Sequence, residues 1–134
     1  MKIVVIDGQG GRLGQMVVEG IKKEALNADI LAIGTNSSAT AAMLKAGADA
    51  AATGENPVVV ACRSADIIVG PIGIVAADSL FGEITPAMAL AVGQSRALKL
   101  LLPVSHCLNE GVGVRDFTMS EMVKATVERL KQLV

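Results

Sequence analysis

The junction at the start of the chain constrains the fold most. Residues 2–7, KIVVID, form an apolar run that ends in Asp7, and GQGGRLG follows at residues 8–14. A β-branched run without polar alternation is typical of a strand covered on both faces, as in a parallel sheet. Glycines after such a strand permit a sharp turn, close approach of backbone N–H groups to a phosphate, and close packing of the next helix. The sequence therefore predicts a strand, a glycine turn that can hold a phosphate, and a helix.

The remaining chain of 134 residues alternates strand and helix signals. We expect helices near residues 11–23, 39–46, 58–63, 75–80, 86–93 and 119–133, and strands at 30–33, 49–52, 65–70, 98–104 and, as a short sixth strand, 112–114. Residues 58–63 contain three consecutive valines, which favour a strand, but a crossover is needed before the next strand. The pattern predicts one α/β domain over residues 1–134, in three layers, with a parallel sheet of five or six strands.

Composition disfavours several classes of function. The formal net charge is −1, there is no Trp or Tyr, and Phe81 and Phe117 are the only aromatic side chains. Nucleic-acid binding by phosphate neutralisation and base stacking is therefore not expected. No apolar stretch approaches the roughly 18 to 20 residues of a membrane span, and no signal-peptide pattern is visible, so we expect a cytoplasmic protein without membrane contact. Cys62 and Cys107 are expected to be reduced thiols, and with a single histidine no metal site is predicted.

The glycine turn has the spacing Gly8-x-x-Gly11-x-x-Gly14, with Leu13 where a G-x-G-x-x-G pattern would place its third glycine. In this form it is similar to the nucleotide loop of dihydrodipicolinate reductases and of extended short-chain dehydrogenases. That resemblance implies a cofactor pyrophosphate held by the loop, whose binding residues are Gly8, Gln9, Gly10, Gly11, Arg12, Leu13 and Gly14. A larger residue at Gly11 is then expected to block the ligand while the fold survives. The alternative is a bare turn that binds nothing.

Four further segments resemble a bacterial domain-of-unknown-function family of short proteins of similar length. They are GTNS at residues 34–37, GEN at 54–56, DIIVGPIGI at 66–74 and GEITPAM at 82–88. This resemblance spans nearly the whole chain. It implies a stand-alone Rossmann-like domain, and it implies no particular activity, substrate or catalytic residue.

The end of the second strand bears on the choice of cofactor. Dinucleotide sites that prefer NAD carry an acidic residue there for the ribose hydroxyls, whereas residues 34–38 are Gly, Thr, Asn, Ser and Ser. Thr35, Asn36 and Ser37 can donate to the 2′-phosphate of NADP, and Arg12 can supply positive charge. The alternative is that these short polar residues cap the next helix. Ligands collect at the carboxyl ends of parallel strands, which adds Gly70, Pro71 and Gly73 to the predicted binding residues.

Signals for catalysis are weak. His106 and Cys107 place a proton carrier beside a nucleophile, but adjacent residues on an extended segment point to opposite sides, and the alternative is a loop histidine with a buried thiol. Asp7 and Glu83 are the other acid–base candidates. The sequence predicts a protein that binds NADP, NAD or another phosphate-bearing ligand, with oxidoreductase activity left open. The alternatives are a non-catalytic nucleotide-sensing or accessory subunit, and an interaction domain that binds no ligand.

The last predicted helix bears on assembly. Its apolar stripe, together with a chain that is 51% hydrophobic, leads us to expect an incompletely covered surface and therefore a homodimer or larger homo-oligomer. The alternative is that this helix covers one face of the sheet in a monomer.

Overall fold

The fold is an α/β arrangement in which a five-stranded parallel sheet has the order β3-β2-β1-β4-β5. The computed structural model describes residues 1–104 and 109–134. In chain order the elements are β1 (Lys2–Asp7), α1 (Arg12–Lys23), β2 (Asp29–Gly34), α2 (Ser37–Lys45), β3 (Ala50–Thr53), α3 (Glu55–Cys62), β4 (Ile67–Pro71), the 3-10 helix η1 (Ile72–Val75), α4 (Pro86–Gln94), β5 (Leu98–Leu102) and α5 (Met119–Leu133). The predicted fold class is confirmed, with five strands rather than six among the described residues.

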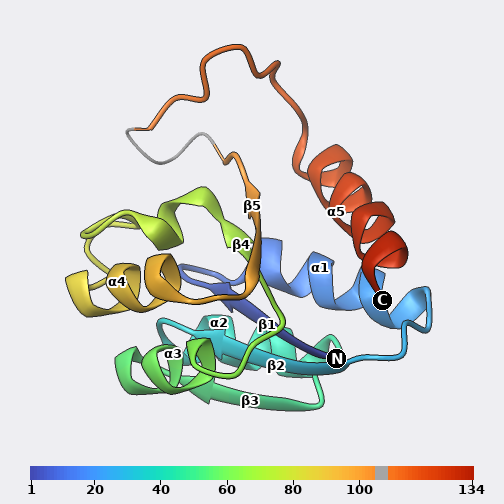
Figure 1. Cartoon of the computed structure of the whole chain (residues 1–134), viewed down its shortest axis with the longest axis horizontal. Coiled ribbons are helices and arrows are strands. Elements are labelled where there is room, and N and C mark those ends of the chain that lie inside the picture. The colour runs from blue at the N-terminus through green and yellow to red at the C-terminus, as the bar shows by residue number, and fades with distance from the viewer. Residues whose placement is uncertain (105–108) are drawn as a thin grey trace.

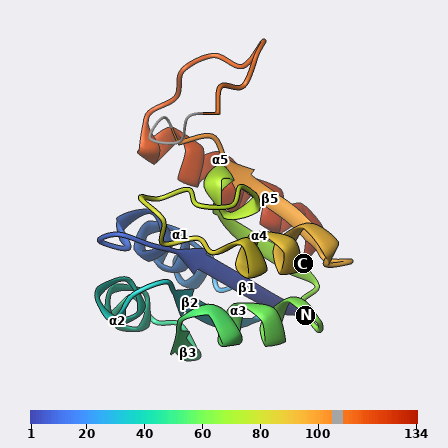
Figure 2. The same ribbon diagram turned by 90° about the vertical axis from the view of Figure 1, so that its left-hand side faces the viewer.

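The sheet separates two hydrophobic cores. On one face, strand residues pack with α1, α2 and α5, and on the other they pack with η1, α3 and α4 (Figures 1 and 2). Strand β1 lies at the centre, where Ile3 and Val5 face the first core and Val4 and Ile6 face the second. All four side chains are 0% exposed. Burial on both faces is the physical reason for the apolar run at the start of the sequence.

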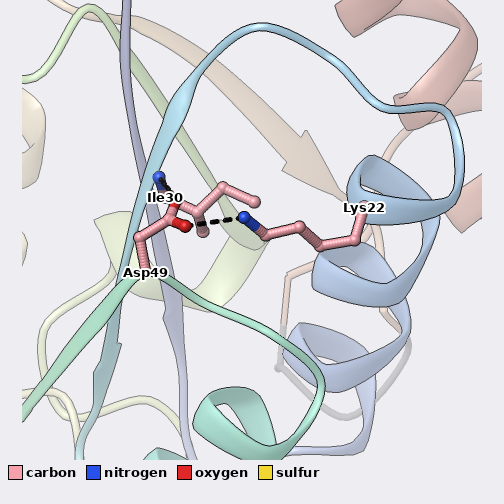
Figure 3. Close-up of polar contacts among 3 residues, drawn as sticks. All are labelled: Lys22, Ile30 and Asp49. Carbon is pink, nitrogen blue, oxygen red and sulfur yellow. Dashed lines mark hydrogen bonds and ion pairs between the residues drawn. The ribbon is translucent and has the colours of Figure 1, made fainter.

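Two hydrogen bonds of Asp49, the residue before β3, connect it to α1 and β2 at the end of the sheet where β2 and β3 begin (Figure 3). The Asp49 carboxylate accepts a hydrogen bond from Lys22 Nζ at 2.7 Å and one from the Ile30 backbone N–H at 2.8 Å. The Lys22 hydrogen bond, together with the Ile30 N–H, lowers the pKa of Asp49. Since both side chains are more than a third exposed, we expect this ion pair to contribute little to stability.

Two sequence predictions about secondary structure are wrong. Residues 75–80 form no α-helix: η1 ends at Val75, and a series of turns follows in which Asp78 and Leu80 adopt positive φ. Residues 112–114 form no sixth strand, because they lie in a turn where the Val114 N–H donates to Gly111 O at 3.2 Å. In both segments the apolar residues resembled those of a regular element, but Gly82, Gly111 and Gly113 favour turns.

Other predicted elements are confirmed. Residues 55–62 form α3 despite their three valines, since the crossover from β3 to the parallel strand β4 requires a connection across the sheet face. Strand β5 ends at Leu102, one residue before Pro103, which has no N–H for the ladder. A capping box opens α5: Thr118 Oγ1 accepts from the Glu121 N–H, and Glu121 Oε1 accepts from the Thr118 N–H.

The apolar stripe of α5 packs on its own domain. Val123, Val127 and Leu130 are each at most 8% exposed and belong to the core that contains α1. A side chain at Gly20 of α1 would meet Val127 Cγ2 at 2.7 Å, so the two helices approach closely at this glycine. This stripe therefore provides no reason for oligomerisation. Within the described residues, no helix is both long and apolar enough to cross a membrane.

Candidate functional site

The glycine turn, residues 8–11, joins the carboxyl end of β1 to the first turn of α1. Buried Asp7 holds it at both ends: Oδ1 accepts from the Gly8 N–H at 2.8 Å, and Oδ2 accepts from the Gly14 N–H at 2.7 Å. The Gly11 N–H donates to Gly8 O at 2.9 Å, which closes the turn. Asp7 thus accepts hydrogen bonds from backbone N–H groups before and within the first turn of α1, and the dipole of this helix favours negative charge at that end.

Burial raises the pKa of Asp7, and the charge of Glu83 raises it further, while the two N–H groups oppose this shift. Asp7 is only 6% exposed, and both carboxylate oxygens already accept hydrogen bonds. A general acid or base must reach the proton that it transfers. The contacts of Asp7 therefore indicate that it stabilises the conformation of the glycine turn. They provide no support for a catalytic role.

Glu83 lies on the same turn although it comes from the segment after β4. Its Oε1 accepts from the Gln9 N–H at 3.0 Å, from Thr35 Oγ1 at 2.7 Å and from Asn36 Nδ2 at 2.6 Å. Burial, the largest single influence, works to raise the pKa of Glu83, but the hydrogen bonds from Thr35, Asn36 and the Gln9 N–H together outweigh it and lower the pKa. An ionised carboxylate therefore lies where β2 ends and the glycine turn begins.

Asn36 and Thr35 have more than one role. Asn36 Oδ1 accepts from the Ala39 N–H at 2.9 Å, and this residue is the N-cap of α2, as the capping alternative expected. Its Nδ2 also donates to Gln9 O at 2.9 Å as well as to Glu83. Ser37 is the exposed first residue of α2. The polar segment after β2 therefore both caps a helix and holds Glu83 against the glycine turn.

Close packing within the protein explains most of the glycines in the predicted site. A side chain at Gly11, whose φ is +72°, would meet Ala39 Cα at 2.6 Å, and one at Gly14 would meet Met43 Sδ at 2.5 Å. A side chain at Gly8 would meet Thr35 Oγ1 at 2.6 Å, and one at Gly70 would meet Ile6 O at 2.4 Å. The expectation that Gly11 can be enlarged without harm to the fold is therefore wrong, because its missing side chain faces the backbone of α2.

Gly10 differs from these four glycines. It is exposed, its φ is not positive, and an added side chain would have nothing within 4 Å. Within residues 1–104 and 109–134, no acceptor pairs with the backbone N–H groups of Gly10, Arg12 and Leu13. Unpaired N–H groups at the start of a helix are the donors that bind phosphate groups.

The other predicted residues lie in different surroundings. The Arg12 side chain is exposed and, among the residues that the structure describes, makes no ion pair. Gly70, Pro71 and Gly73 are buried. Cys62 is 4% exposed in the second core, as expected, and burial raises the pKa of its thiol. His106 and Cys107 lie outside the described residues. In the described part of the chain, no three His, Cys, Asp or Glu side chains are grouped to hold a metal ion.

Sequence reasoning placed Glu83 only as an isolated catalytic candidate and missed its contacts. The positions that it joins are 74 and 48 residues away along the chain, at Gln9 and Thr35. The signal in the sequence was indirect: the expected acid after β2 was absent, while polar donors stood in its place. The carboxylate of Glu83, from the segment after β4, places a negative charge beside Thr35 and Asn36, where residues 34–38 contain no acid.

The family described as Domain of unknown function (DUF3842) matches residues 2–134. The chain belongs to this family. The resemblance to a domain-of-unknown-function family is thereby confirmed, while the similarity of the glycine loop to dihydrodipicolinate reductases and extended short-chain dehydrogenases stays a prediction. Among curated proteins, none matches the chain in sequence.

Two solved structures resemble the chain remotely. One is a dodecameric FMN-dependent UbiX-like decarboxylase from Escherichia coli O157:H7, with 16% identity and a TM-score of 0.44 over 99% of this chain and 94% of that one. The other is a nucleoside-diphosphate-sugar epimerase from Pseudomonas aeruginosa, with 14% identity and a TM-score of 0.45 over 98% of this chain and 47% of that one.

Proposed function

We propose that this protein binds a dinucleotide, NAD or NADP, or a related phosphate-bearing ligand, with the phosphates on the glycine turn. The observation that carries the proposal is the set of N–H groups of Gly10, Arg12 and Leu13, which have no acceptor among the described residues. They lie at the carboxyl edge of a parallel sheet and at the N-terminus of α1, and both features favour phosphate binding. Open space over Gly10 gives a phosphate access to the backbone.

Glu83 affects the choice between the two cofactors. A carboxylate beside the end of β2 can accept the adenosine ribose hydroxyls of NAD and repels the 2′-phosphate of NADP. The sequence favoured NADP because residues 34–38 contain no acid, whereas Glu83 lies on Thr35 and Asn36 in the structure. We therefore expect NAD to bind more tightly than NADP.

The second candidate function is non-catalytic nucleotide sensing within a larger assembly. The contacts of Asp7 favour it, because this buried acid–base candidate accepts two backbone hydrogen bonds and does not reach the proton of a substrate. In both candidate functions the ligand occupies the same turn. Reduction or oxidation of bound NAD with candidate substrates distinguishes an oxidoreductase from a sensor.

The test compares Gly10→Val with Gly93→Val. Gly93 is an exposed glycine of α4 that also has nothing within 4 Å of an added side chain, so the two substitutions are sterically matched within the fold. NAD and NADP are titrated against the thermal stability of each variant. Ligand at 100 times its Kd is expected to add about 2.7 kcal/mol to the stability of the parent protein and of Gly93→Val.

Gly10→Val is expected to lose this stabilisation because its side chain occupies the space through which the phosphates approach the N–H groups. Equal stabilisation of both variants would remove the glycine turn as the binding site. Absence of stabilisation in the parent protein by either nucleotide, up to millimolar concentration, would contradict the proposed function itself.

A further inference from the structure

Phe81 is the most exposed large apolar side chain of the described residues, at 97% exposure. It lies in a run of three left-handed residues, with φ of 55° at Leu80, 55° at Phe81 and 85° at Gly82. Positive φ is a true outlier for a bulky side chain and is unfavourable by the order of 1 kcal/mol or more. Neither the exposure nor the strain of Phe81 is explained by the packing of the domain.

The turn that carries Phe81 is firmly attached. The Asp78 N–H donates to Ile84 O at 2.7 Å, and the Ile84 N–H donates to Ser79 O at 3.2 Å, which closes residues 78–84 into a loop. Ser79 Oγ donates to Gly73 O. Leu80, at 8% exposure, and Ile84, at 1%, anchor the loop in the second core. Phe81 is therefore an exposed residue on a loop whose neighbouring residues are anchored by hydrogen bonds and by burial.

The residues before and after Phe81 in this loop lie against the glycine turn. Leu80 Cδ1 would lie 3.0 Å from a side-chain carbon added at Gly8, which places the residue before Phe81 on the turn. Glu83, two residues after Phe81, accepts from the Gln9 N–H. Phe81 is thus an exposed aromatic ring between two residues that touch the candidate phosphate loop.

We propose that Phe81 is the stacking surface for the base of a nucleotide ligand, so that the ligand carries an aromatic base and is not a simple phosphate ester. This inference rests on the proposed function. In a nucleotide the base is attached to the ribose, and the ribose to the phosphates. Glu83 lies on the glycine turn through the Gln9 N–H, and the exposed Phe81 comes two residues before it in the same loop. The loop can therefore present an aromatic face for the base and a carboxylate for the ribose hydroxyls, while the N–H groups of Gly10, Arg12 and Leu13 bind the phosphates. A preformed aromatic face binds a base with little loss of side-chain entropy.

The test measures the affinities for ADP and for pyrophosphate by calorimetry in the parent protein, in Phe81→Ala and in Phe117→Ala. Phe117 is the other phenylalanine of the chain and lies under Arg115 near the start of α5, so it is the matched control. Loss of one stacked base weakens binding by about 5- to 150-fold. We expect this loss for ADP in Phe81→Ala, a change of less than about twofold for pyrophosphate in that variant, and no change in Phe117→Ala.

Two further variants separate stacking from apolar contact. Phe81→Trp is expected to restore ADP binding and Phe81→Leu is not, because only the former has a π-face. The chain has no tryptophan of its own, so the fluorescence of the Phe81→Trp variant should be quenched by ADP and unaffected by pyrophosphate. Unchanged ADP affinity in Phe81→Ala, or equal weakening of ADP and pyrophosphate, would overturn this inference while the proposed function stands. A parent protein that binds neither compound would overturn both.

A change of molecular mass in Phe81→Ala, measured by light scattering, with unchanged ADP affinity would also overturn the inference. That result would assign the exposed ring to a contact between protein chains.

Discussion

Asp7 and Glu83 show how the same functional group titrates differently in two environments. Both carboxylates accept backbone N–H groups of the glycine turn. Asp7 is buried beneath the turn, where desolvation raises its pKa, whereas Glu83 is partly exposed and gains two side-chain donors that help to lower its pKa. The two charges are also coupled, because the charge of Glu83 raises the pKa of Asp7. Residue type alone therefore does not determine which carboxylate is ionised most easily.

The raised pKa of Asp7 predicts the sign of a pH dependence. The folded protein binds this proton more tightly than the unfolded chain does, so the contribution of Asp7 to stability decreases as pH rises above its ordinary pKa of about 3.9. We expect the free energy of unfolding of the parent protein, minus that of Asp7→Asn, to fall between about pH 3 and pH 7, as measured by urea unfolding.

Asp49→Asn is the matched control with the opposite sign. The pKa of Asp49 is lowered by the hydrogen bond from Lys22, so its contribution is present above the ordinary pKa of about 3.9 and is lost as pH falls through the folded value. The corresponding difference for this variant should therefore rise with pH at the acid end of this range, by a small amount because both partners are exposed, and stay constant above about pH 5. Parallel trends in the two variants would show that the environment assigned to Asp7 is wrong.

At the scale of elements, α5 is positioned by a contact that helix propensity does not predict. Gly20 lies in the interior of α1, where alanine would normally be preferred, but an added side chain would lie 2.7 Å from Val127 Cγ2. The open side of Gly20 therefore permits the close approach of α5 to α1. The capping box at Thr118 determines where α5 begins, and the contact at Gly20 determines where it docks.

Gly20→Ala is therefore expected to destabilise the protein, by about 1 to 3 kcal/mol, because overpacking outweighs the gain in helix propensity. Gly93→Ala, in α4, is the control: with nothing within 4 Å it should stabilise by about 0.5 to 1 kcal/mol. Urea unfolding measures both. Adding Val127→Ala should recover part of the loss in a double-mutant cycle. A stabilising Gly20→Ala would show that the helices do not meet at this glycine.

At the scale of the whole molecule, the common direction of the parallel strands places different groups at the two ends of the sheet. The glycine turn, Asp7 and Glu83 lie at the carboxyl ends of β1 and β2. Asp49 lies at the opposite end of the sheet, where it precedes β3 and hydrogen-bonds to α1 and β2. Strand β5 lies at the side of the sheet away from β3, and α5 packs near it with a pocket of about 310 Å³ between them. The proposed binding site and the Asp49 contacts therefore lie at opposite ends of the sheet.

The prediction of a homodimer or larger assembly belongs to this scale. Its original reason, an uncovered stripe on α5, no longer holds, since Val127 and Leu130 are buried against their own domain. A hydrophobic content of 51% remains, and Leu98, Val112 and Val114 are still exposed, so we continue to expect self-association. Light scattering at micromolar concentration should give at least twice the chain mass of 13.7 kDa. A monomeric mass, with stability unchanged on dilution, would contradict the prediction.

The features that the sequence by itself determined depend on residues that are close together in the chain. The apolar run of β1, the glycine turn after Asp7 and the capping box of α5 were predicted correctly, because periodicity, backbone freedom and capping act between residues close in the chain. The alternation of these signals was enough to predict a parallel sheet covered on both faces. Residues 75–80 failed as a helix because Leu80 and Ile84 are buried as anchors of a strained turn, which has no helical period.

Only the tertiary structure decided the roles within the candidate site. Gly11 is required by Ala39 and Gly8 by Thr35, which leaves Gly10 as the open glycine of the turn. Glu83 reaches Gln9 across 74 positions of sequence, and this contact reversed the argument for NADP. The physical reason is common to these findings: close approach and hydrogen bonding depend on positions in space, and residues distant in the chain leave no periodic signal of where they meet.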